Sequence, residues 1–213
     1  DPQGKLLGRI TIDDVVDVIR EQADHSLAVM AGLGDGDVFT TVLATAPQRA
    51  IWLAINLATA ILAASVIAFY QDTIEKVVAL AVLMPIVASM GGIAGTQSLT
   101  VLIRAMAMGQ INDRTEIWLV RREIFVSIIN GLIWAFVIAV IAAYWFDDTT
   151  LGLIIAFAII INLITAGIAG ASLPLILDRL RIDPALAGGV VLTTITDVVG
   201  FFAFLGVAAY FYN

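Results

Sequence analysis

Five long apolar runs constrain this chain more than any other feature of its sequence. A helix needs about 20 predominantly apolar residues to cross the hydrocarbon core of a bilayer. Runs of that length follow one another from about residue 49 to the end of the chain. The pattern predicts an all-α integral membrane protein with five transmembrane helices per subunit. The expected spans are Ala50–Tyr70, about Glu75 to Met108, about Glu123 to Phe146, about Leu151 to Leu177, and about Pro184 to Tyr212.

The residue types that are missing narrow the chemistry. The chain has no cysteine, and its one histidine, His25, lies in the polar N-terminal segment. Soft metal sites built from thiolate or imidazole are therefore excluded from the apolar region. A metal handled there must be bound by oxygen, which favours Mg²⁺ or Ca²⁺. No nucleophile–base pair, GxSxG or HExxH motif is present, so we expect neither an enzyme nor a nucleic-acid partner.

The basic residues indicate an orientation. With five spans, ten of the eleven Lys and Arg residues fall on the side of the N-terminus, and Lys76 alone falls on the other side. The positive-inside rule then places the N-terminus in the cytoplasm and the C-terminus outside. We expect a multi-pass protein of the inner (plasma) membrane, in contact with membrane lipid.

The polar N-terminal segment differs from the rest of the chain. Residues 1–48 contain eight acidic and three basic residues, and Thr11 is a candidate N-cap for a following helix. Four acids share one helical face, and like charges at that spacing repel each other. The face is either simply solvated or a cytoplasmic cation-sensing surface. Its residues are Asp13, Asp17, Glu21 and Asp24. The chain begins without methionine or signal peptide, so we expect a piece of a longer protein.

The second apolar run contains residues that disturb a helix. Pro85 removes a backbone donor, and Gly91 and Gly95 form a GxxxG pair that lets helices approach closely. We expect a broken or kinked span. The glycines serve either tight packing or an opened stretch of backbone that lines a cavity. The same run supplies Gly92 and Gln97 as further candidate lining residues.

Asp197 is the most informative residue of the fifth run. A carboxylate at bilayer depth is costly and is usually functional. Every arginine lies near a predicted cytoplasmic end, so no base is available to pair with it. A structural alternative is a carboxylate capped by a hydroxyl or by Asn162. The functional alternatives are a cation site in a wet pathway and a proton-carrying acid in a coupled transporter.

A symmetric dimer would bring two copies of Asp197 together, which suits a divalent ion. Since Mg²⁺ sheds water reluctantly, hydroxyls and backbone carbonyls around the carboxylates would hold it through its hydration shell. The candidate ligands are Thr193, Thr194 and the backbone carbonyl oxygens near Gly188 and Gly189, and Gly200 is a further candidate lining residue on the Asp197 face.

Two motifs carry a family resemblance. Together with the five spans, two motifs resemble the MgtE family of magnesium channels, namely "GGIAGTQSLTVLIRAMAMGQI" and "DPALAGGVVLTTITDVVGFFAFL". The N-terminal segment is similar to the end of a CBS domain and reads "GKLLGRITIDDVVDVIREQAD". The resemblance implies a homodimer with a pore between the second and fifth spans and a hydrated Mg²⁺ at Asp197 of each subunit. It also implies three parts: a CBS-like remnant (1–23), a plug-like connecting helix and linker (24–48), and a pore domain (49–213), without the family's N-terminal regulatory domains.

The sequence departs from the family pattern near the expected pore. Ile93 and Thr96 replace two asparagines of the second-span motif, and Gly189 and Val190 replace an Asn-Pro pair. These changes leave Mn²⁺, Co²⁺ and Ca²⁺ as alternatives to Mg²⁺. The implied function is a Mg²⁺ channel. The alternatives are a divalent-metal transporter coupled to H⁺ or Na⁺, and a structural membrane domain.

Overall fold

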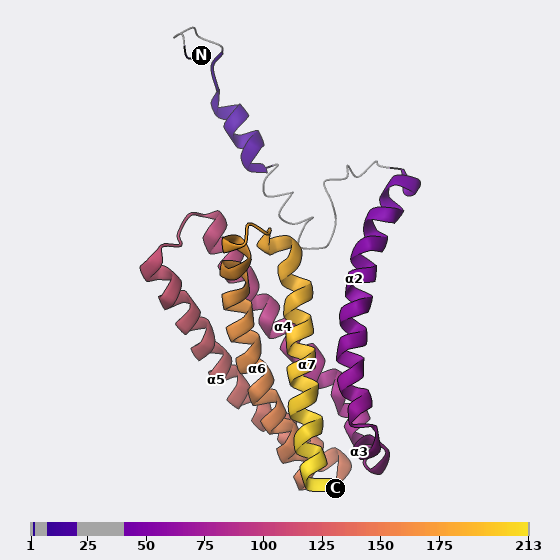
Figure 1. Ribbon diagram of the computed structural model, residues 1–213. Helices are drawn as coiled ribbons and strands as arrows, with labels where there is room; N and C mark the ends of the chain where they lie inside the picture. The colour runs from indigo at the N-terminus through magenta and orange to yellow at the C-terminus, as the bar shows by residue number, and fades with distance from the viewer. Residues whose placement is uncertain (1, 3–7, 21–40, 213) are drawn as a thin grey trace. The chain divides into compact units, whose positions relative to one another are not determined.

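The computed structural model describes residues 2, 8–20 and 41–212. Five of its helices are long and apolar enough to cross a membrane, which confirms the predicted number of spans. They are α2 (Val42–Phe69), α4 (Ala79–Ala107), α5 (Asp113–Phe146), α6 (Thr149–Arg179) and α7 (Pro184–Tyr212), and the short helix α3 (Gln71–Lys76) joins α2 to α4 (Figure 1). The described residues contain no strand, so the all-α class is confirmed as well.

Polar residues set the ends of two helices. Asn112 caps α5, because its Oδ1 accepts hydrogen bonds from the backbone nitrogens of Arg114 (3.1 Å) and Thr115 (3.0 Å). The Thr115 hydroxyl in turn accepts from the Asn112 backbone nitrogen, which completes a capping box. Asp148 caps α6 in the same way through the backbone nitrogens of Thr150 and Leu151. The chain reverses between α5 and α6 at Asp147, which has a left-handed φ of 51°.

The helix α4 is continuous, although its sequence contains Pro85 and three glycines. Helical backbone runs from Ala79 to Ala107, and the interruption before it falls at residues 77–78, after α3. The expected break at Pro85 and the alternative of an opened backbone at Gly91 and Gly95 are therefore wrong, whereas the alternative of a kinked span stays a prediction. A proline can stay within a helix when neighbouring helices support the freed backbone.

The helix α6 lies at the centre of the unit formed by residues 53–213, and it contacts α4, α5 and α7. Its buried residues are rich in glycine and alanine, which let neighbouring helices approach closely. The largest hydrophobic core joins α6 to α4 and α7 through side chains such as Leu83, Ile155 and Phe204. This packing fixes the relative positions of α4 and α7, which form the groove described below.

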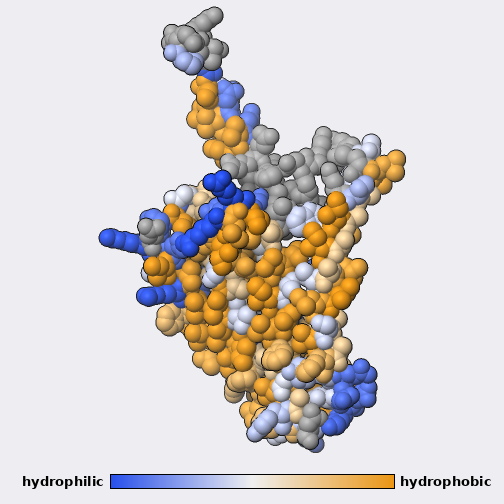
Figure 2. Space-filling model, in the orientation of Figure 1, coloured by the Kyte–Doolittle hydropathy of each residue, from blue (hydrophilic) through white to orange (hydrophobic). Residues whose placement is uncertain are grey.

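The outer surface of this unit is apolar. Figure 2 shows hydrophobic side chains along the visible faces of the helices, with hydrophilic ones gathered near their ends. Residues 53–69 of α2 contribute exposed Leu53, Leu57 and Ile61, and only a narrow side around Ala63 packs on the core. Such a surface suits a bilayer rather than water.

The chain divides into two units, and residues 1–52 form the N-terminal one. Residues 12–20 are helical, and both the backbone nitrogen and the hydroxyl of Thr11 donate to Asp14 Oδ2 (2.8 and 2.6 Å), at the expected start of the helix. Asp13 and Asp17 are exposed on this helix. Glu21 and Asp24 lie outside the described residues, as does most of the connecting segment predicted at 24–48. The three-part division of the chain stays a prediction.

Candidate ion-binding groove

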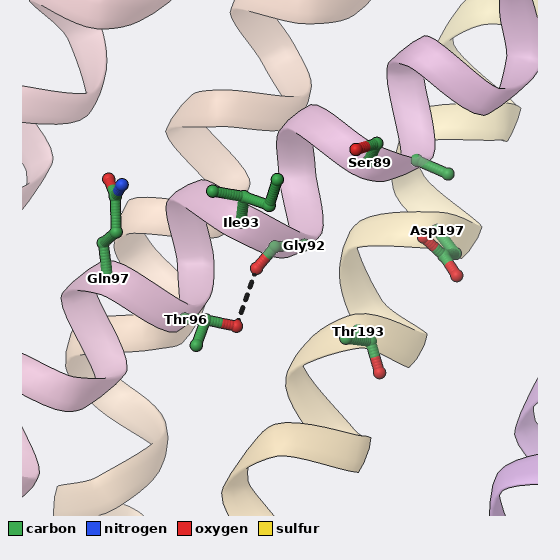
Figure 3. A pocket seen from close by; sticks show the side chains of 8 residues that line it. Ser89, Gly92, Ile93, Thr96, Gln97, Thr193 and Asp197 are labelled. Carbon is green, nitrogen blue, oxygen red and sulfur yellow. Dashed lines mark hydrogen bonds between the residues drawn. The ribbon is translucent and has the colours of Figure 1, made fainter.

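A groove of ≈ 520 Å³ lies between α4 and α7. Asp197 and Thr193 stand one turn apart on α7 and face the same side, as Figure 3 shows. The α4 wall combines small, apolar and polar side chains. Its residues are Ala88, Ser89, Gly92, Ile93, Thr96 and Gln97. The structure therefore brings together four residues named from the sequence, two from each of the predicted pore helices: Gly92 and Gln97, and Thr193 and Asp197.

The Asp197 carboxylate has no hydrogen bond or ion pair within the part of the chain that the structure describes. Its neighbour Thr193 donates its hydroxyl proton to the backbone oxygens of Gly189 and Val190, both at 3.1 Å. Thr96, on the opposite wall, donates in the same way to Gly92 (2.8 Å). Both hydroxyl oxygens keep lone pairs available to accept a hydrogen bond. The groove thus offers acceptors and a negative charge, which suits a hydrated cation.

Four glycines predicted to line the pore contact side chains of this chain instead. A methyl group at Gly95 would lie 2.8 Å from Leu192, and one at Gly188 would lie 3.0 Å from Leu99. Gly91 and Gly200 both face the side chain of Asn162. The helices pack closely at these four positions, whatever their part in a pore.

Three other predicted residues lie apart from the groove lining. Pro85 is exposed on α4, and Thr194 donates its hydroxyl proton to the Val190 backbone oxygen at 2.7 Å. A methyl group at Gly189 would have nothing within 4 Å. A pore role for these residues stays a prediction.

Asn162, on α6, lies behind the groove and is fully buried. Its side-chain nitrogen donates to the Val87 backbone oxygen of α4 at 2.7 Å, and its Oδ1 has no partner among the residues that the structure describes. The amide fits between Gly91 of α4 and Gly200 of α7. The structural alternative in which Asn162 caps Asp197 is therefore wrong, because this amide joins α4 to α6.

Sequence reasoning missed the buried acid Glu123. It accepts a hydrogen bond from the Ser98 hydroxyl of α4 (2.9 Å) and pairs with Arg122 Nη1 (2.9 Å). The available signal was an acid directly after two arginines at the start of an apolar run. This acid was used only to place the start of the third span.

The groove of one chain holds few metal ligands. Among the described residues, no group of three or more His, Cys, Asp or Glu side chains lies close enough to hold a metal ion. A divalent cation at Asp197 would therefore need water molecules, a second copy of the chain, or both, to complete its coordination.

These features define a multi-pass membrane protein with an unpaired carboxylate in a groove between two of its spans. Comparison with known proteins gives the family. Residues 84–207 match the MgtE family, described as divalent cation transporters, and the chain belongs to this family.

Curated relatives agree with this assignment. The chain is 34% identical to "Magnesium transporter MgtE" of Bacillus subtilis, with 97% of this chain and 46% of the relative covered. It is 32% identical to the protein of the same name from Thermus thermophilus, with 98% and 47% covered. The chain thus spans about half the length of the curated relatives it matches.

Proposed function

We propose that this chain is the pore domain of a Mg²⁺ channel, which lets Mg²⁺ cross the membrane down its electrochemical gradient past Asp197. The observation that carries the proposal is the unpaired carboxylate of Asp197 in an open groove at the middle of α7. An isolated charge in a lipid-facing groove is costly, so a cation or water must accompany it. The name of its relatives, magnesium transporters, supports Mg²⁺ as the cargo.

A homodimer would complete this site. The wall of α4 exposes Thr96, Gln97 and Thr100, which are polar groups unsuited to contact with lipid tails. A second copy packed against this face would remove them from lipid and bring a second Asp197 to the groove. Two carboxylates balance the charge of one divalent ion, and the hydroxyls and backbone oxygens would bind its water shell.

The proposed orientation places the N-terminus in the cytoplasm. Exposed arginines gather at one end of the helices, with Arg104 in the last turn of α4 and Arg179 in the last turn of α6. Anionic lipid headgroups on the cytoplasmic side would attract this end. The exposed Asp13 and Asp17 of the N-terminal helix are then available to cytoplasmic cations.

The test is Mg²⁺ entry into proteoliposomes under a membrane potential, without a pH or Na⁺ gradient. We expect flux in the wild type and none in Asp197→Ala, while Asp178→Ala, which removes an exposed acid at the end of α6, should conduct normally. Size-exclusion profiles show whether the variants remain folded. Flux that appears only with a pH or Na⁺ gradient would establish the coupled transporter instead, and no flux under any gradient would favour the structural domain.

A further inference from the structure

A buried hydrogen bond ties α4 to α5 on the side of α4 away from the groove. Glu123 and Ser98 are 5% and 3% exposed, and the Ser98 hydroxyl donates to Glu123 Oε2 at 2.9 Å. The other carboxylate oxygen accepts from Arg122, whose side chain is half exposed. Both oxygens of Glu123 are thus engaged, one by a neighbouring helix and one by its own.

The helix α6 makes room for this connection. A methyl group at Gly170 would lie 2.9 Å from Ser98 Cβ, and one at Gly167 would lie 2.6 Å from Ser127 Cβ and 3.2 Å from the Glu123 backbone oxygen. These two glycines are three residues apart, so they share one face of α6. This face has no side chains of its own where those of α4 and α5 meet. Few other direct contacts join α4 to α5.

The position of Ser98 gives this bond a consequence for the groove. The buried residues of α4 recur every three or four positions and include Gly91, Gly95, Ser98 and Leu102, whereas Ile93 and Gln97 line the groove. Neighbouring residues of an α-helix differ by about 100° around its axis. A rotation of α4 by one residue in one direction would therefore move Gln97 to the buried place of Ser98 and bring Thr96 to the place of Gln97.

We propose that Glu123 is a positioning residue for the ion pathway: through Ser98 it fixes the rotation of α4, so that Gln97 lines the groove that contains Asp197. The link to ion transport rests on the proposed function, but the effect on α4 does not. A carboxylate suits this task because it accepts two hydrogen bonds and donates none. Glutamine would present an amide nitrogen to one of the two donors.

The main test uses Ser98→Ala, a mild change that removes the same bond from the α4 side. The chain contains no cysteine, so Gln97→Cys and, separately, Thr193→Cys provide single labelling sites in this chain for a water-soluble thiol reagent. In proteoliposomes, Ser98→Ala should slow labelling at Gln97→Cys by about tenfold, the effect of losing one hydrogen bond to a charged group. Labelling at Thr193→Cys, on α7, should stay within about twofold, since that helix does not form the bond.

Three further variants make the test specific. Ser127→Ala removes a buried serine from the neighbouring surface of α5 and should leave labelling at Gln97→Cys unchanged. Glu123→Ala should reproduce the effect of Ser98→Ala, and Glu123→Gln should restore part of it, because the amide oxygen can still accept from Ser98. If Glu123→Ala does not fold, the labelling of Ser98→Ala alone decides whether the proposal is correct.

Labelling and transport are measured on the same samples, so their failures can be separated. If labelling slows at Gln97→Cys alone, the proposal is supported even when the protein transports no Mg²⁺. The absence of transport would contradict only the channel function. Equal changes at Gln97→Cys and Thr193→Cys would show general loosening and overturn the proposal. Unchanged labelling in Ser98→Ala would overturn it as well.

Discussion

Two carboxylates in apolar helices of this protein have opposite surroundings. Glu123, on α5, is buried, and both of its oxygens accept hydrogen bonds from Ser98 or Arg122. Asp197, on α7, is partly exposed in a groove, and no described side chain bonds to it. The comparison shows that an acid within a span is not by itself an ion site. An acid whose two oxygens both accept hydrogen bonds from the protein stabilises the fold, whereas an acid without such partners is available to a cation.

The strongest challenge to this comparison is Asp197→Asn, which keeps the size of the side chain and removes its charge. We expect Mg²⁺ flux in proteoliposomes to fall by about 30-fold or more, since losing a charge from a desolvated charge pair typically costs about 2–5 kcal/mol. The unfolding temperature in detergent should not fall, because the carboxylate has no partner among the described residues. A large loss of thermal stability with preserved flux would assign Asp197 a structural role.

The glycines extend the comparison from charge to packing. Gly91→Ala would place a methyl group 2.7 Å from Asn162 Cγ, so we expect a loss of about 1–3 kcal/mol in the free energy of unfolding, as for other overpacked cores. Gly189→Ala, where nothing lies within 4 Å, is the matched control. It should be neutral or gain about 0.5–1 kcal/mol from helix propensity. Unfolding of both variants by denaturant in detergent gives the difference, and equal losses would contradict the assigned packing.

Asp148 is a third carboxylate, which lies outside the spans. Both of its side-chain oxygens accept hydrogen bonds from the protein. A hydrogen bond from Tyr212 is the largest cause that lowers the pKa of Asp148 below its ordinary value of 3.8, against a smaller opposing effect of burial. A lowered pKa contributes stability above the ordinary pKa, and this contribution is lost as the pH falls through the pKa of the folded protein.

Tyr212→Phe should therefore reduce stability at neutral pH by about 1 kcal/mol, the usual worth of one hydrogen bond. Between pH 3.8 and lower values, the wild type should lose this advantage and the two unfolding temperatures should converge. A difference that stays constant across acidic pH would show that the tyrosine acts by packing alone.

The smallest expected effect concerns the hydroxyl beside Asp197. Thr193→Val keeps the shape of the side chain and removes an oxygen that faces the groove. If this oxygen binds the water shell of the ion, flux should fall by about threefold, which corresponds to a weak net hydrogen bond. Thr194→Val, one residue away and outside the groove lining, should change flux by less, and the reverse order would place the pathway on another face of α7.

The sequence was most informative about features that depend on local pattern. Apolar run lengths predicted five spans, and the lone acid of the fifth run led to Asp197, which lies in the groove with Thr193. Contacts between helices were harder to predict. Pro85 and the glycines suggested a broken helix, but α4 is continuous, because packing against α6 and α7 compensates for weak local propensity.

The same limit applies to Glu123 and Asn162. Their partners lie 25 and 75 residues away in the sequence, so no local pattern could identify those partners. The glycines that were predicted to line the pore show the same limit. These residues are Gly91, Gly95, Gly188 and Gly200. A small residue next to a candidate pore is compatible with lining or with packing, and only the side chain opposite it decides which.

The length of α5 has a consequence for how the bilayer would act on the protein. Its apolar part, about residues 123–146, extends over about 36 Å, whereas the hydrocarbon core is about 30 Å thick. A helix of this length accommodates a thinner or thicker bilayer by changing its tilt, at a modest cost per ångström of mismatch. Because Glu123 sits on α5 and is bonded to α4, a change of tilt would act as a lever on the wall of the groove. Under the proposed function, lipid chain length would then alter ion passage without any ligand.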